Sequence, residues 1–199
     1  MLDIVGISKS YNRKKVLHDI SFSLKPGTLT GITGENGCGK STLLKIIMGE
    51  LKADRGMVYV KGSVGYCPQE PLIFPTLTVE ENFCYFAAAY GIINKEGKKT
   101  FQEDVLHQLG LAPYLNEQVH KLSGGTRQKL NLSIGLLHDP DICILDEPYG
   151  GFDIETYRSF WELILHLRDK GKSILLVAHL LNNIEHFDNL LTLKGGIFV

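Results

Sequence analysis

Alternating apolar and polar positions predict β-strands in the first third of the chain. DISFSL (19–24) alternates, and a KPG turn separates it from a second apolar run, TLTGIT (28–33). Two further strands, GMVYV and VGYCPQ, are expected on either side of a Gly-Ser turn at 62–63. STLLKIIMG (41–49) is instead apolar at helical spacing and ends at a glycine, so it predicts a helix.

The pattern becomes helical from about residue 78 to residue 138. This block opens with TVEENFCYFAAAYG, in which Thr78 and Glu81 have the spacing of a capping box. A capping box satisfies backbone N–H groups at the start of a helix, so we expect a helix to begin directly after Thr78.

Short strands return in the last third. DICILD (141–146) and SILLVAH (173–179) are nearly continuous apolar runs, as expected for strands that a parallel sheet buries on both faces. An amphipathic helix at about 154–170 separates them, and a short helix and NLLTLKGGIFV end the chain. Strands that alternate with helices predict an α/β fold whose mixed sheet is largely parallel.

Length and composition fit one globular domain. The chain has 199 residues, of which 44% are hydrophobic and 22% charged. We expect a single domain, 1–199. Its α/β core is predicted to come from 1–70 and 139–199, and a helical subdomain from 71–138 is predicted to be inserted between them.

Charge and cysteine content narrow the possible functions. The formal net charge of −1 argues against a dedicated nucleic-acid binder, so no nucleic-acid partner is expected. The four cysteines include no C-x-x-C pair, which favours reduced thiols in a cytosol over disulfides or a zinc site. The first residues do not resemble a signal peptide, and the longest apolar stretch, 83–93, is too short to cross a bilayer. We therefore expect a cytoplasmic protein.

A glycine-rich segment between a predicted strand and a predicted helix carries the first chemical signal. GENGCGKST (34–42) satisfies the pattern G-x-x-x-x-G-K-[ST]. The glycines let backbone N–H groups approach and cradle phosphates. In such a site Lys40 reaches the β- and γ-phosphates, and the Ser41 hydroxyl binds Mg²⁺. The expected nucleotide-binding residues of this loop are Gly34, Glu35, Asn36, Gly37, Cys38, Gly39, Lys40, Ser41 and Thr42.

Two acidic residues end the buried strand in ICILDEP (142–148). A carboxylate at the carboxyl end of a parallel strand faces the ligand crevice of an open α/β sheet. We expect Asp146 to hold Mg²⁺ through water, and Glu147 to be the general base for an attacking water. Together with the glycine-rich loop, these acids predict a nucleotide hydrolase of the P-loop class.

A third motif, LSGG within KLSGGTRQKL (121–130), shows which P-loop family the chain resembles. Ser123, Gly124 and Gly125 precede an amphipathic run, and a helix N-terminus there would attract anions. With the other two motifs in this order, the chain resembles the ATP-binding cassette (ABC) ATPases over essentially its whole length. Their LSGGQ signature is present here with Thr126 in place of the glutamine.

The resemblance implies a fold, ligands and partners. The fold is a P-loop NTPase core with antiparallel N-terminal strands and a helical subdomain, and the ligands are ATP and Mg²⁺. In that family the signature binds the γ-phosphate of ATP held by the other subunit of a head-to-tail dimer. Ser123, Gly124 and Gly125 are therefore expected to contact the nucleotide of a second ATP-binding subunit, in a homodimer or a heterodimer.

The resemblance also implies roles for four single residues. Tyr11 corresponds to an aromatic residue that stacks on adenine, and Gln69 to a glutamine that senses Mg²⁺ and the attacking water. His179 corresponds to a histidine that contacts the γ-phosphate. Asp153 belongs to a loop that crosses the dimer interface. That loop departs from the family pattern, because PYGGFD (148–153) stands where P-T-S-G-L-D is common.

Three functions fit these motifs. We favour the ATPase subunit of a membrane transporter, peripheral on the inner face of the membrane, whose transmembrane subunits are separate chains. The alternative is a soluble ABC ATPase that acts on the ribosome or DNA. Translation-type members of the family usually carry two cassettes in one chain, whereas this chain has one. Chromosome and repair types insert long coiled coils, for which an insertion of roughly 50 residues is too short. A regulatory module without turnover is disfavoured by Glu147, since only hydrolysis needs a base there.

The segment from Gln69 to about Tyr90 is the predicted docking surface for a transmembrane subunit, and its apolar loop EPLIFPTLT (70–78) is expected to be exposed. Its start at Gln69 would let it respond to the state of the nucleotide. Within it, the residues expected at the interface are Ile73, Phe74 and Leu77. The residues expected in the core of the helical insertion are Phe83, Phe86 and Ala87.

Overall fold

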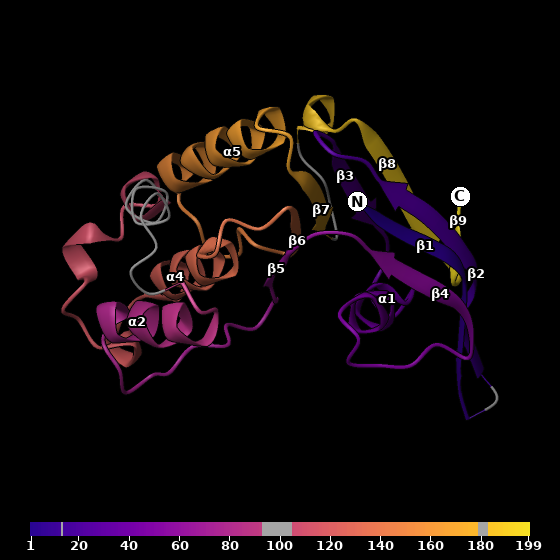
Figure 1. Ribbon diagram of the computed structural model, residues 1–199, viewed down its shortest axis with the longest axis horizontal. Coiled ribbons are helices and arrows are strands. Elements are labelled where there is room, and N and C mark those ends of the chain that lie inside the picture. Colours follow the sequence, from indigo (N-terminus) through magenta and orange to yellow (C-terminus); the bar gives the residue numbers. More distant parts are fainter. Residues whose placement is uncertain (13, 93–104, 179–182) are drawn as a thin grey trace.

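The computed structural model describes residues 1–12, 14–92, 105–178 and 183–199. The described residues form two lobes (Figure 1). Helices α2 (Val79–Ala89), α4 (Gly124–Leu136) and α5 (Ile154–Asp169) lie in one lobe. Helix α1 (Lys40–Ile47) lies in the other lobe with the strands of the N-terminal region. Strands β5 (Val64–Cys67), β6 (Ile142–Asp146) and β7 (Ser173–Val177) lie between the two lobes.

An antiparallel sheet forms from the N-terminal strands. Its order is β2 (Lys14–Leu24), β1 (Leu2–Tyr11), β4 (Arg55–Val60), and both pairings are antiparallel. In β2, Leu17, Ile20 and Leu24 are buried and Phe22 is half-buried, whereas Asp19, Ser21 and Ser23 are exposed. The expected antiparallel N-terminal strands are therefore confirmed.

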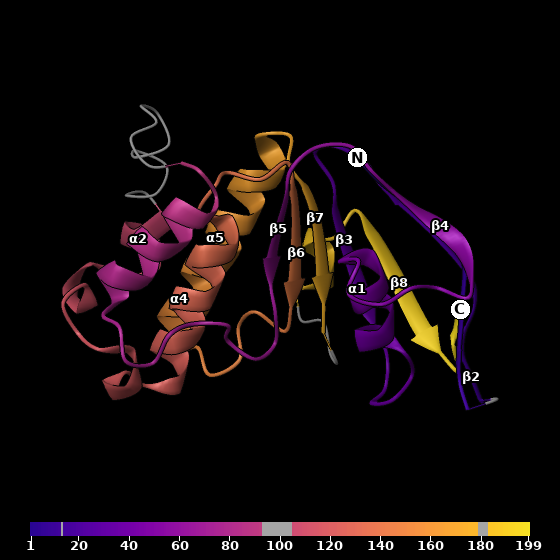
Figure 2. The same ribbon diagram turned by 60° about the horizontal axis from the view of Figure 1, so that its bottom comes forward.

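A six-stranded sheet forms the centre of the molecule (Figure 2). Its order is β5-β6-β7-β3-β8-β9; the first five strands run parallel, and only β9 is antiparallel to its neighbour. The strand bounds are β3 Leu29–Thr33, β5 Val64–Cys67, β6 Ile142–Asp146, β7 Ser173–Val177, β8 Asn189–Lys194 and β9 Ile197–Phe198. The predicted mixed, largely parallel sheet is confirmed, and all residues of β6 and β7 are buried.

The helices follow the predicted pattern with shorter bounds. The α-helices are α1 Lys40–Ile47, α2 Val79–Ala89, α4 Gly124–Leu136 and α5 Ile154–Asp169. The short 3-10 helices are η1 Ala112–Tyr114, η2 Val119–Lys121 and η3 Ile184–His186. The capping box is present: Glu81 N donates to Thr78 Oγ1 at 3.1 Å, and Thr78 N donates to Glu81 Oε2 at 2.7 Å.

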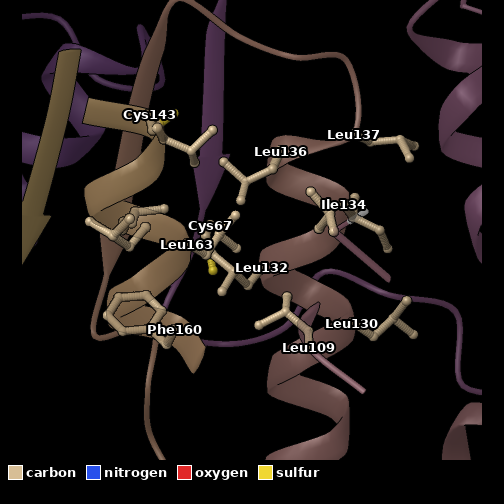
Figure 3. Close-up of a cluster of buried hydrophobic side chains, with 14 of the residues drawn as sticks. Cys67, Leu109, Leu130, Leu132, Ile134, Leu136, Leu137, Cys143, Phe160 and Leu163 are labelled. Atoms are coloured by element: carbon tan, nitrogen blue, oxygen red, sulfur yellow. The ribbon is translucent and has the colours of Figure 1, made fainter. Parts of the chain in front are cut away.

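The parallel strands separate two hydrophobic clusters. On one face, Cys143 and Leu145 of β6 belong to the α4–α5 cluster, which includes Leu132 and Phe160 (Figure 3). On the other face, the alternate β6 residues Ile142 and Ile144 belong to the α1 cluster, built from α1, β1 and β2. The residues of α1 in that cluster are Leu43, Leu44, Ile46 and Ile47. Strand β6 therefore packs against both clusters, because successive side chains point to opposite faces.

Within the described ranges, no helix is both long enough and apolar enough to cross a membrane.

Candidate nucleotide-binding site

A pocket of about 180 Å³ lies at the carboxyl edge of the parallel strands. The strands β3, β5 and β6 run in the same direction, so the segments that follow them meet at one edge of the sheet. The residues that line the pocket are Val16, Asn36, Gly37, Gly39, Lys40, Ser41, Thr42, Gln69, Asp146 and Glu147. The glycine-rich loop, the two acidic residues and Gln69 are therefore brought together as the sequence predicted, whereas Gly34, Glu35 and Cys38 are not among the lining residues.

The glycine-rich loop leads directly into α1. Gly39, which caps the helix, has φ +116°, and a Cβ there would lie 2.8 Å from Leu17 Cδ2. Only glycine fits this position without displacing β2, so the loop follows the strand closely. Lys40 is only 8% exposed, and its Nζ donates to the carbonyl oxygens of Gly34 at 2.5 Å and Glu35 at 3.2 Å. The loop thus holds the ammonium group beside its own backbone.

Glu147 and Gln69 face each other across the pocket. Gln69 Nε2 donates to Glu147 Oε2 at 3.0 Å. Glu147 has φ +47°, an uncommon conformation for a residue with a side chain, and its N–H donates to Val177 O at 2.8 Å. Such strain persists where the surroundings impose it and is concentrated at functional sites. Strand β7 therefore fixes the backbone from which the Glu147 carboxylate reaches the pocket.

The negative charge of Asp146 affects its neighbours. Asp146 ends β6 and is 8% exposed. Burial, with a smaller contribution from the Asp146 charge, raises the pKa of Tyr66 to about 12. The same two causes raise the pKa of the Cys67 thiol. A buried carboxylate of this kind favours a nearby cation.

The donor set fits a nucleotide with Mg²⁺. An ammonium group, a helix N-terminus and loop N–H groups suit phosphates. A hydroxyl, a carboxamide and a carboxylate oxygen suit a hard cation, and Ser41, Gln69 and Asp146 offer these groups around one pocket.

The signature motif begins α4, away from this pocket. Ser123 is the N-cap, and its Oγ accepts from Thr126 N at 3.1 Å. The Thr126 hydroxyl lies 2.9 Å from Ser123 Oγ. The expected helix N-terminus is present, but none of Ser123, Gly124 and Gly125 lines the pocket.

The loop 148–153, whose sequence departs from the family pattern, packs against α4, the helix that begins with the signature motif. A Cβ built on Gly125 would lie 2.4 Å from Gly151 O, so the two backbones touch. The two aromatic residues of the loop anchor it on α5: the Tyr149 and Phe152 rings lie 5.6 and 6.2 Å from that of Phe160. Burial is the main cause that raises the pKa of Tyr149 to about 12. Two of the departures from the family pattern, Tyr149 and Phe152, thus pack against α5.

Two predicted residues, Tyr11 and Asp153, lie apart from the pocket. Tyr11 is 44% exposed on β1, with Lys9 Nζ 5.8 Å from the centre of its ring, and it does not line the pocket. Asp153 caps α5, and the Thr156 N–H that it accepts at 2.7 Å is the main cause of its lowered pKa. His179 lies outside the described residues. Sequence reasoning missed Val16, which lines the pocket from β2 without any motif to mark it.

Comparison with known proteins agrees with this geometry. The family model for "ABC transporter" matches residues 17–150. The linearmycin resistance ATP-binding protein LnrL of Bacillus subtilis is 33% identical over 93% of this chain, and the match spans 63% of LnrL. A solved ATP-binding subunit of an ABC transporter superposes with a TM-score of 0.92 at 28% identity, covering 100% of this chain and 88% of that one.

A second solved structure supports the fold alone. The bacterial ABC transporter cassette MJ0796, solved as a dimer, has a TM-score of 0.87 at 24% identity, and the match covers 100% of this chain and 96% of that one. The fold and the site thus define an ATP-binding ATPase cassette of the P-loop class. The chain belongs to the ABC transporter family. The family, the fold class and the enzyme class predicted from sequence are therefore confirmed.

Proposed function

We propose that this chain is the ATP-hydrolysing subunit of an ABC membrane transporter, on the inner face of the membrane. The observation that carries the proposal is the contact between Gln69 and Glu147 inside the pocket that the glycine-rich loop also lines. It brings a candidate base to a phosphate-binding loop. Two copies would pair head to tail around two ATP molecules, and transport would require separate transmembrane subunits.

Each residue of the pocket has a role in this proposal. Lys40 and the loop N–H groups bind the β- and γ-phosphates. Ser41, Gln69 and Asp146 would hold Mg²⁺, which neutralises charge on the phosphates. Glu147 Oε accepts the proton of the attacking water, and the Gln69 amide orients that carboxylate.

The proposed dimer gives a role to groups outside the pocket. Ser123, Gly124 and Gly125 expose a helix N-terminus, which attracts anions, and nothing lies within 4 Å of a Cβ built on Gly124. We propose that this turn binds the γ-phosphate of the ATP held by the second subunit. Tyr11, Asp153 and His179 keep their predicted roles at the adenine, the dimer interface and the γ-phosphate.

An exposed apolar patch, formed by Leu72, Phe74, Tyr85 and Tyr90, is the proposed docking surface for the transmembrane subunit. Their exposed fractions range from 38% for Phe74 to 66% for Leu72. The Phe74 ring lies 4.6 Å from that of Tyr85, and buried Asn82 fixes the Phe74 backbone through hydrogen bonds to its N–H and carbonyl. Of the neighbouring apolar residues, Ile73, Phe86 and Ala87 pack against the α4–α5 cluster. We therefore propose Leu72 in place of Ile73 for docking, and Phe74 and half-buried Leu77 keep the role predicted for them.

The substitution Glu147→Gln tests the proposal. It keeps the size of the side chain and removes the base, so we expect ATP to bind with wild-type affinity and phosphate release to slow at least about 10²-fold. Exposed Glu162→Gln on α5 is the control and is expected to keep wild-type turnover. The Glu147→Gln variant should also dimerise when ATP is added, which sedimentation would detect. Near-wild-type turnover would refute the role of Glu147, and an ATP-bound monomer would refute the dimer.

A further inference from the structure

A buried amide on the signature helix contacts the segment that leads to Gln69. Asn131 of α4 is 3% exposed. Its Nδ2 donates to Pro68 O at 2.7 Å and to Cys67 Sγ at 3.3 Å. Pro68 has no N–H, and its carbonyl can only accept, so the amide nitrogen must face it. Asn131 therefore uses both of its N–H groups on the two residues that precede Gln69.

A second contact joins the same helix and strand. A Cβ built on Gly65 of β5 would lie 2.2 Å from Gly135 O, and one built on Gly135 would lie 2.8 Å from Tyr66 O. Backbones this close leave no room for independent sliding, because any side chain would clash. The C-terminal half of α4 and the end of β5 are thus joined both by packing and by the Asn131 hydrogen bonds.

The series of contacts from Asn131 continues through Gln69 to Glu147, the candidate base. Gln69 follows Pro68 directly, and its amide donates to Glu147 Oε2. At the other end of α4, Ser123 and its glycines form the turn assigned to the second subunit's ATP. Helix α4 therefore connects the turn proposed to bind the second subunit's ATP with the segment that carries Gln69 into this chain's own nucleotide pocket.

We propose that Asn131 is a positioning residue that sets Gln69 against Glu147 according to the position of α4. A shift of α4 when its N-terminus engages the second nucleotide moves Pro68 through Asn131, and Gln69 moves with Pro68. This inference rests on the proposed head-to-tail dimer for its trigger. The link between Asn131 and Glu147 lies within one chain and is tested there.

Asn131→Ala removes both hydrogen bonds, and Asn131→Leu removes them while keeping the branched shape of the side chain. We expect kcat for ATP hydrolysis to fall about tenfold in both, the change that one hydrogen bond of ordinary strength produces. The affinity for ATP should stay within about twofold, because Asn131 does not line the pocket. Ser133→Ala is the matched control: Ser133 is also fully buried on α4, but its Oγ donates to Lys129 O within the helix. It should keep the wild-type kcat.

A double-mutant cycle with Gln69→Ala separates positioning from a general structural role. If Asn131 acts through Gln69, its substitution should cause no further loss of kcat once Gln69 is alanine. Losses that multiply, or an equal loss in Ser133→Ala, would overturn the proposal. Failure of both Asn131 variants to fold would also overturn it, in favour of a structural role. If the chain hydrolyses ATP but the Glu147→Gln variant stays monomeric, the proposed dimer is refuted. The double-mutant cycle then still tests whether Asn131 positions Gln69.

Discussion

Gly125→Ala is expected to destabilise the protein, although alanine normally favours a helix. Gly125 lies in the first turn of α4, where alanine would by itself stabilise the helix by about 0.5–1 kcal/mol. The new Cβ, however, would lie 2.4 Å from Gly151 O and 3.3 Å from Gly151 C. These are backbone atoms, so no flexible side chain can move out of the way.

The size of the effect follows from these opposing contributions. Overpacking of this kind costs about 1–3 kcal/mol, which exceeds the gain in helix propensity. We therefore expect the free energy of unfolding to fall by about 1–2 kcal/mol. Gly124→Ala is the matched control, since its Cβ would have nothing within 4 Å. It should leave the free energy of unfolding unchanged or raise it by up to about 1 kcal/mol.

Urea denaturation of both variants without nucleotide measures the difference. The two variants should differ by about 2 kcal/mol, or roughly 4–8 °C in Tm for a chain of this size. Equal free energies of unfolding for Gly124→Ala and Gly125→Ala would refute the close contact between the signature helix and the 148–153 loop. An effect confined to ATP turnover would also refute the packing argument, because the clash exists without nucleotide.

Three further predictions concern nucleotide and partner binding. Lys40→Ala should weaken ATP binding at least about tenfold in a titration, because a charge-assisted contact is lost; unchanged affinity would contradict the phosphate role. A maleimide should inactivate the enzyme at half-buried Cys38 and Mg-ATP should protect it, whereas inactivation that persists in Cys38→Ser would implicate exposed Cys84. Phe74→Asp should keep wild-type ATPase activity but abolish co-purification with the transmembrane subunit; retained assembly would place docking elsewhere.

Local patterns in the sequence were enough to predict most of the helices and strands and the phosphate-binding loop. The continuous apolar runs of β6 and β7 reflect burial on both faces, and the capping box at Thr78 is a contact between close neighbours. β1 has no clear alternation, and its bounds were not predicted. Register shifts at Ile7 and Lys9 interrupt its pairing with β2, so the period of two is lost.

Contacts between distant residues could not be derived from local patterns. Gln69 and Glu147 are 78 residues apart, and only the resemblance to a family suggested that they meet. The contact of Gly125 with Gly151 and the hydrogen bonds of Asn131 depend on how α4 packs, and no spacing in the sequence encodes them. Val16 is an ordinary strand residue whose position under the loop follows from sheet geometry alone.

Strand β6 contributes side chains to both hydrophobic clusters, and this affects whether the chain can be cut into fragments that fold separately. Leu132 and other apolar residues of α4 pack against Cys143 and Leu145, which lie outside the predicted subdomain 71–138. A peptide cut at those boundaries would expose this surface to water at a cost of about 25 cal/mol for each Å². We therefore expect the excised helical segment to aggregate rather than to fold on its own.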